Sequence, residues 1–374
     1  MSRPPSRLED LGFRRASPRE LHDVWMRWRR GKLPLERAPT DPFPVPLAIV
    51  HREPLVVYGG IVPDAPLGPA GLLGRAMRKA PAWFLLSPTW TLEDEAIARR
   101  TRRYAILHRW RNRHHRLVFV CSTEEEAALL RARGEAAFVH NKTTHVREDV
   151  FRPLPEARVE FDAIYNAQLV PWKRHELAVA IPRCAFLFYR SRHAYGSTEA
   201  AERALVARHL AAAPGHVFLN PYDAAGWPVR FPPEEVNRHL NRAAVGLCLS
   251  ETEGSMFSCV EYLLAGLPVV TTPNRGGRDF FADGVCCVTA APEPRAIADA
   301  VAAQRERGLA PEEIRERTLE RVRRERERFV SLLRDVYARA GVQNGALGTA
   351  ASGRPFTMTW TLSDDARDQL IAAS

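Results

Sequence analysis

The stretch GLCLSETEGSMFSCVEYLLAGLPVVTTPNRGGRDFF, residues 246–281, decides the expected fold. Val245–Leu249 is a short apolar run, which predicts a buried strand. A helix is expected over Ser255–Ala265, because apolar side chains recur on one face and Gly266 supplies a typical end. A second apolar run, Leu267–Thr271, predicts the next strand. Strands that alternate with helices in this way indicate parallel β/α units.

Two polar turns follow the two predicted strands. Ser250–Gly254 follows the first and Asn274–Gly277 the second, and each leads into a helix. Ligands of such sheets bind beyond the carboxyl ends of the strands, and helix N-termini attract anions. Glu253 and Glu261 lie in or just after the first turn, and carboxylates accept hydrogen bonds from hydroxyl groups. The pattern therefore predicts a site for a ligand that carries both phosphate and sugar hydroxyls.

The order E-G-x-x-x-x-x-x-E from Glu253, A-G-x-P-V-V from Ala265 and G-G-x-D from Gly276 resembles the donor-site signature of retaining family 4 glycosyltransferases (glycosyl transferases group 1). The resemblance implies a GT-B fold, in which two Rossmann-like β/α/β domains face each other across a cleft. It implies that Glu253 contacts the transferred sugar as a catalytic residue and that Glu261 binds the ribose of the nucleotide. It also implies that the donor is held by the backbone of Gly254, Ser255, Met256, Phe257, Gly276 and Gly277.

Both carboxylates also have a purely structural interpretation. Ser250-x-x-Glu253 and Ser258-x-x-Glu261 each fit the capping box of a helix N-terminus. The complete ordered signature is more specific than either capping box, so we favour the donor site.

A further turn, after the predicted strand Phe161–Tyr165, resembles the family pattern G-R-L-x-x-x-K-G. Lys173 matches the lysine that the resemblance places on the donor diphosphate, and we expect it to stabilise the leaving group. Gln168 stands where the family has arginine, and Arg174 stands where it has glycine; Arg174 either restores the missing charge or faces solvent. Asn220 lies at the strand end where the family binds the nucleobase, although Asn-Pro is also an ordinary turn sequence.

Composition limits the class of protein. The chain has 374 residues, 45% hydrophobic and 26% charged, with no apolar run of 18 residues and no apolar signal segment near the N-terminus. Its six cysteines lack C-x-x-C spacing, which indicates buried thiols in a cytoplasmic protein. The net charge of +10 suggests an anionic partner, with membrane contact at the inner face of the cell membrane as one hypothesis, although a GC-rich genome also favours arginine.

The β/α alternation runs through both halves of the chain. We expect an N-terminal Rossmann-like acceptor domain over residues 1–155, which includes a basic helix at 17–30. A C-terminal donor domain is expected over 156–340, and a linker and tail over 341–374. In many GT-B proteins the end of the chain packs back on the first domain. A strand is expected at Thr357–Leu362, with Ser363 and Asp364 capping a final helix.

Two basic segments of the first domain have two interpretations each. The helix 17–30 carries Leu21, Trp25 and Trp28 at helical spacing, with arginines at its far end. We favour a helix packed on the first domain over one that contacts lipid. The segment 99–116 holds eight arginines, which by default form a solvated face and alternatively a patch facing lipid.

The family resemblance implies a metal-independent retaining glycosyltransferase. Its donor is a nucleotide diphosphate sugar, and its acceptor is a glycan, a lipid-linked molecule or a small molecule, in cell-envelope polysaccharide or glycoconjugate synthesis. No cofactor, metal site or nucleic-acid partner is expected, since no spaced His/Cys cluster and no Walker A motif appear. One alternative keeps the fold and changes the reaction to that of a sugar-nucleotide epimerase or a phosphorylase. Another is a non-catalytic binding protein on a degenerate transferase fold.

Overall fold

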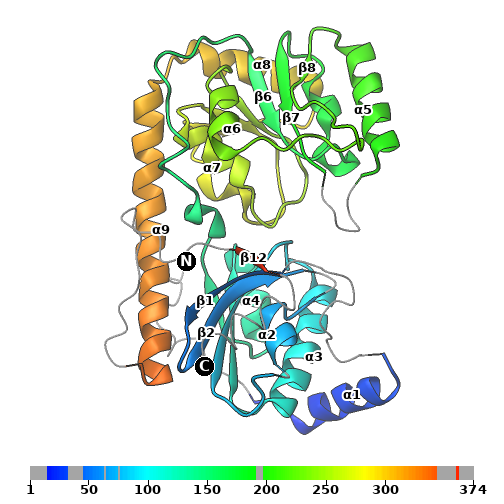
Figure 1. Cartoon of the computed structure of the whole chain (residues 1–374), viewed down its shortest axis with the longest axis vertical. Helices are drawn as coiled ribbons and strands as arrows, with labels where there is room; N and C mark the ends of the chain where they lie inside the picture. The colour runs from blue at the N-terminus through cyan, green and yellow to red at the C-terminus, as the bar shows by residue number, and fades with distance from the viewer. Residues whose placement is uncertain are drawn as a thin grey trace. The chain divides into compact units, whose positions relative to one another are not determined.

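The chain forms two compact units in a computed structural model that describes residues 15–32, 45–62, 65–74, 76–190, 197–342 and 359–361. Unit 1 comprises residues 1–145 and 324–374, and unit 2 comprises residues 146–323. Each unit contains one six-stranded sheet with helices packed against it (Figure 1).

The sheet of unit 1 has the strand order β12-β1-β2-β3-β4-β5. Its strands are β1 (Val45–His51), β2 (Leu55–Ile61), β3 (Ala82–Pro88), β4 (His115–Cys121), β5 (Ala137–Val139) and β12 (Thr359–Thr361). Strands β2 to β5 are parallel, whereas β1 pairs antiparallel with both β2 and β12. Only three residues join β1 to β2, which is too short for a parallel crossover.

The helices of unit 1 are α1 (Pro18–Arg29), α2 (Pro69–Leu73), α3 (Glu95–Arg111), α4 (Glu124–Ala132) and the 3₁₀ helix η2 (Lys142–His145). The predicted start of α1 is confirmed, because Ser17 and Glu20 form a reciprocal capping box. Asp94 caps α3 through its carboxylate, and Thr123 caps α4 through its hydroxyl.

The sheet of unit 2 is entirely parallel, as predicted, with the order β11-β10-β9-β6-β7-β8. Its strands are β6 (Ala163–Asn166), β7 (Cys184–Leu187), β8 (Val217–Phe218), β9 (Gly246–Cys248), β10 (Val269–Thr271) and β11 (Cys287–Thr289). Its helices are α5 (Glu199–Ala212), α6 (Pro233–Leu240), α7 (Phe257–Leu264), α8 (Pro294–Glu306) and the 3₁₀ helices η3 (Pro171–Lys173), η4 (His175–Ala178) and η5 (Gly277–Phe281).

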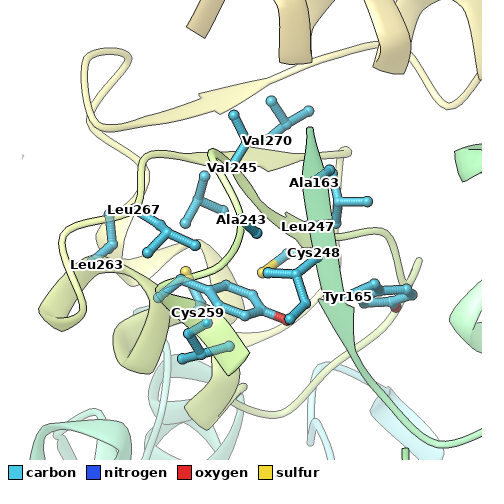
Figure 2. Packing of buried hydrophobic residues seen from close by; sticks show 14 of the residues in the cluster. Ala163, Tyr165, Ala243, Val245, Leu247, Cys248, Cys259, Leu263, Leu267 and Val270 are labelled. Atoms are coloured by element: carbon cyan, nitrogen blue, oxygen red, sulfur yellow. The ribbon is translucent and has the colours of Figure 1, made fainter. Parts of the chain in front are cut away.

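The predicted apolar face of α7 packs in the core of unit 2. Val260, Leu263 and Leu264 are buried there. Figure 2 shows Leu263 in this cluster with Cys259 of the same helix and Cys248 of β9. Gly246 of β9 lies so close to the ring of Tyr262 that an added Cβ would come within 2.4 Å of it. Gly266 ends α7 with φ +84°, as the sequence predicts. All six cysteines are buried free thiols, also as predicted.

The units divide at different residues from those expected. The sequence predicts a boundary near 155, but the division falls after 145, because Val146, Val150 and Phe151 are buried in the core of unit 2. The sequence assigns residues to 340 to the second domain, but the helix α9 (Pro311–Ala340) belongs to both units. Side chains from its first part are buried in the core of unit 2. Phe329, Leu333 and Val336 of its second part pack against the sheet of unit 1.

Of three other local predictions, the helix from Trp172 is wrong, the tail strand expected at Thr357–Leu362 is confirmed as β12, and the final helix lies outside the described residues. The helix expected from Trp172 is replaced by η3 and η4, which are separated by Arg174 in the left-handed conformation. The tail contributes β12, whose backbone pairs with β1 of unit 1. The greater part of the linker, 343–356, and the final helix expected after Ser363 and Asp364 lie outside the described residues. None of the described helices combines the length and apolar character needed to cross a bilayer.

Candidate functional site

Three loops of unit 2 meet at the carboxyl edge of the sheet. They follow β6, β9 and β10, which are neighbours in the sheet order. Backbone hydrogen bonds join the loops after β9 and β10: Glu253 N donates to Arg275 O at 3.0 Å, and Gly277 N donates to Gly254 O at 3.0 Å. The predicted signature is therefore one connected structure, and it lies where ligands of parallel sheets bind.

Lys173 and Glu253 form an ion pair between Nζ and Oε1, with side chains only 13% and 10% exposed. Ser250 Oγ donates to the same carboxylate oxygen at 2.8 Å. The position of Lys173 is fixed through its backbone, because its carbonyl accepts a hydrogen bond from Tyr165 Oη at 2.9 Å. The structure thus brings together the two residues that the sequence predicts to be catalytic.

Neither predicted carboxylate is a helix cap. Helix α7 begins at Phe257 with Met256 as its N-cap and no side-chain capping bond. Ser258 instead donates its hydroxyl to Asn166 O at 3.0 Å. The capping-box alternative is therefore wrong for both Ser250–Glu253 and Ser258–Glu261.

Glu261 lies one turn into α7, partly exposed, and no hydrogen bond or ion pair is made by its carboxylate within the described parts of the chain. Desolvation by burial raises its pKa from about 4.5 to about 7, and the charge of Arg230 opposes that rise. Arg230 belongs to the loop after β8, and its guanidinium carbon lies 5.4 Å from the ring centroid of Tyr189. A carboxylate in this state favours a ligand that donates hydrogen bonds to it.

The start of α7 presents further groups for binding. The first N–H groups of a helix have no carbonyl partner within it, and here they belong to a segment that includes Phe257, which is 41% exposed. Ser255 Oγ is buried and has no hydrogen-bond partner in the described structure. Met256 is buried and packs in the core, so only its backbone is available.

Arg174 neither faces solvent nor points freely to a ligand. It adopts φ +50°, its Nε donates to Leu249 O at 2.6 Å, and its Nη2 donates to Thr272 Oγ1 at 2.7 Å. Desolvation lowers its pKa. Arg174 therefore fastens the carboxyl ends of β9 and β10 beside Lys173. The side chain of Gln168 is partly buried, and no hydrogen bond of that side chain is found among the described residues.

Two other predicted donor ligands have local structural partners. Asn220 Oδ1 accepts from Phe188 N at 2.7 Å, and its Nδ2 donates to Val229 O at 2.8 Å, so it ties the loop after β7 to the loop after β8. Gly276 has φ 108°, a left-handed conformation that favours glycine. The amide of Gly277 is already used by Gly254, as described above.

Sequence reasoning missed Arg278, which is 2% exposed. Its guanidinium donates to the carbonyls of Ser250 and Thr272 and contacts Asp279 at 3.2 Å. The available signal was an arginine directly after the two glycines of the signature, followed by Asp279 and two phenylalanines. Arg278 and Arg174 together place two cations beneath the site, and both hold the same two loops.

No group of three or more His, Cys, Asp or Glu side chains that suits a metal ion occurs in the described residues. The expectation of a metal-independent reaction remains a prediction.

Comparisons with known proteins agree with this geometry. Residues 196–304, all within unit 2, match the family model of glycosyl transferases group 1. No curated protein matches the chain. Among solved structures, Anabaena HepE in complex with UDP is similar, with a TM-score of 0.51 and 12% identity over 74% of this chain and 83% of that chain.

The HepE complex with UDP-glucose gives a TM-score of 0.50 at 12% identity, over 75% of this chain and 84% of that one. Sucrose-phosphate synthase from Thermosynechococcus elongatus gives 0.47 at 17% identity, over 80% and 71%. The chain therefore has the GT-B fold, and its unit 2 carries a glycosyl transferases group 1 domain.

Proposed function

We propose that this protein is a retaining glycosyltransferase that moves a sugar from a nucleotide diphosphate sugar to a glycan, lipid-linked or small-molecule acceptor. The observation that carries the proposal is the ion pair of Lys173 with Glu253 at the carboxyl edge of the sheet. Glu261 lies one turn into α7, the helix that follows this edge, where the charge of Arg230 acts on it. A cation, a buried carboxylate and a second carboxylate that has no partner among the described residues suit a ligand that has phosphates at one point and hydroxyls at two others.

The site suggests a role for each group. Lys173 is paired with Glu253 in the free protein, so a diphosphate that takes over the ammonium releases the carboxylate for the hydroxyls of the sugar. The diphosphate gains negative charge as the glycosidic bond breaks, and Lys173 then stabilises the leaving group. The first amides of α7, and the Ser255 hydroxyl, which has no hydrogen-bond partner in the described part of the chain, add donors at the start of this helix.

Similar folds support the donor class. The HepE structures named above hold UDP and UDP-glucose, although their identity to this chain is only 12%. Retention at the anomeric carbon, independence of metal and a role in cell-envelope polysaccharide or glycoconjugate synthesis belong to the proposal, as does a cytoplasmic location.

Thermal unfolding with UDP-, GDP-, ADP- and dTDP-sugars tests the proposal. A donor present at about 100 times its Kd adds about 2.7 kcal/mol to the stability of the folded state, so one of the four should raise the melting temperature by several degrees. Glu261→Gln should reduce that shift, whereas Glu306→Gln, at an exposed position near the end of α8, should not. If none of the four nucleotide sugars raises the melting temperature, the donor site is wrong and the binding-protein alternative gains.

The reaction is then tested with the donor that binds. Turnover that requires an acceptor supports a transferase. Consumption of the donor without an acceptor indicates an epimerase, and dependence on free phosphate indicates a phosphorylase.

A further inference from the structure

Helix α1 lies at the margin of unit 1, next to α3 (Figure 1). It exposes a row of apolar side chains. Leu21 and Trp25 lie one turn apart and are 43% and 41% exposed. Trp28, one turn further, meets Trp110 of α3 edge-on at 5.8 Å, and Trp110 is 53% exposed. We call Leu21, Trp25 and Trp110 the tryptophan face.

The opposite side of α1 is held firmly. Val24 is buried in the core of unit 1. Asp23 pairs with Arg103 of α3 at 3.0 Å, and Glu20 pairs with Arg102 at 3.5 Å. The exposure of the tryptophan face is therefore a fixed property of a helix that is capped and clamped.

Several arginines of α3 form ion pairs with carboxylates of unit 1. Arg102 and Arg109 both bind Glu135, whose carboxylate is buried, and Arg102 is itself only 4% exposed. Arg99 pairs with Glu95 one turn away. Arg102 is thus a structural residue and does not face lipid. For the other arginines of segment 99–116 the surface facing lipid stays a prediction.

Cations without acidic partners gather instead at the end of α1. Arg29, Arg30 and Lys32 are exposed, and no carboxylate pairs with them among the described residues. Arg29 lies over the ring of Trp25, with its guanidinium carbon 5.2 Å from the centroid. The two acidic side chains of α1 are neutralised by the arginines named above, so this end of the helix is positive.

We propose that the tryptophan face and these three cations dock unit 1 on an anionic membrane surface. Tryptophan rings favour the boundary between lipid head groups and acyl chains, and each cation near an anionic surface adds about fivefold to the binding constant. Stable peripheral binding needs an apolar and an electrostatic signal together, and the helix supplies both. A second copy of the chain is a less suitable partner for this surface, because the cations of the two copies would repel each other.

Co-sedimentation of the full chain with vesicles tests this surface, independently of any sugar-transfer activity. Vesicles of phosphatidylcholine alone are compared with vesicles that also contain phosphatidylglycerol. The unaltered chain should bind the anionic vesicles, and salt should weaken the binding. Leu21→Ser/Trp25→Ser should reduce it by at least about tenfold, and the exposed apolar control Val159→Ser should leave it unchanged.

The electrostatic part has its own matched pair. Arg29→Glu/Arg30→Glu should also reduce binding by at least about tenfold, whereas Arg208→Glu/Arg295→Glu, with the same charge change on exposed positions of unit 2, should not. Unchanged melting temperatures establish that the variants fold, and Trp110→Ser provides a variant outside α1. Equal binding to neutral vesicles, or equal loss in both charge variants, overturns the proposal. Self-association that is lost in Leu21→Ser/Trp25→Ser, without vesicle binding, would assign the face to a second copy and also overturn it.

Discussion

Lys173 and Glu253, 80 residues apart, form an ion pair that joins the loops after β6 and β9. The pair is almost enclosed, and Ser250 shares its carboxylate. In the structure the ammonium and the carboxylate neutralise each other; in the proposed function the first binds the diphosphate of the donor and the second its sugar. A ligand that separates them must satisfy both, which favours a molecule with phosphate and hydroxyl groups at a fixed spacing over phosphate alone.

Replacement of the lysine tests its role in the reaction. Lys173→Ala should lower kcat/KM by about one to two orders of magnitude, because a hydrogen bond to a charged group contributes roughly 1.5–3 kcal/mol. Steady-state kinetics with the donor found by thermal shift measures the change. Lys79→Ala removes an exposed lysine of unit 1 and should leave the kinetics unaltered. Unchanged kinetics in Lys173→Ala would remove this residue from the site.

The same pair makes a prediction about stability. Lys173→Met leaves the enclosed carboxylate of Glu253 without its counter-charge, so the melting temperature should fall by about 5 °C or more. The double variant Lys173→Met/Glu253→Gln removes both charges and should recover at least about half of that loss. Differential scanning calorimetry of the unaltered chain, the single variants Lys173→Met and Glu253→Gln, and the double variant completes a double-mutant cycle. Equal loss in the single and double variants would mean that the two side chains are not coupled.

We expect the carboxylate of Glu261 to lower the stability of the folded chain although it helps to bind the donor. Its pKa is raised to about 7 in the folded chain, so between about pH 4.5 and 7 the unfolded chain holds fewer protons, and stability falls as pH rises. Glu261→Gln should therefore raise the melting temperature at pH 8 more than at pH 5, while it weakens donor binding by about tenfold. Thermal unfolding at the two pH values, with and without donor, gives both numbers. A variant that is equally stabilised at both values would argue against the raised pKa.

Three buried histidines predict acid sensitivity. Burial lowers the pKa of His108 and His175 to about 3 and that of His209 to about 4. Below about pH 6.5 these histidines bind protons in the unfolded chain but not in the folded chain. Their contribution to the stability of the folded state is therefore complete above that pH and falls as pH drops toward 4. The loss approaches about 1.4 kcal/mol per pH unit for each histidine.

His175 offers the sharpest variant, because neither ring nitrogen has a hydrogen-bond partner in the described structure. His175→Phe should reduce the slope of melting temperature against pH between about 4 and 6.5, since one of the three histidines no longer contributes. The exposed His114→Phe serves as the control. Identical slopes in His175→Phe and the unaltered chain would show that this ring does not titrate as described.

The sequence was most informative where a local pattern of residues is typical of a single secondary structure. The apolar spacing of Val260, Leu263 and Leu264 predicted the buried face of α7, and Gly266 predicted its end. Strand and helix alternation predicted the parallel sheet of unit 2, because a parallel crossover requires a helix of about that length. It failed after β6, where the left-handed Arg174 replaces the expected helix with two short 3₁₀ turns.

The candidate site divides in the same way. The sequence by itself determined which residues stand at the carboxyl ends of the strands, because that follows from the order of strands, turns and helices along the chain. Only the tertiary structure decided that Lys173 meets Glu253, that Arg174 and Arg278 are used to hold the loops, and that α9 contributes to both units. The reason is physical: these contacts join residues far apart in sequence, and their geometry depends on packing and desolvation that no local spacing encodes.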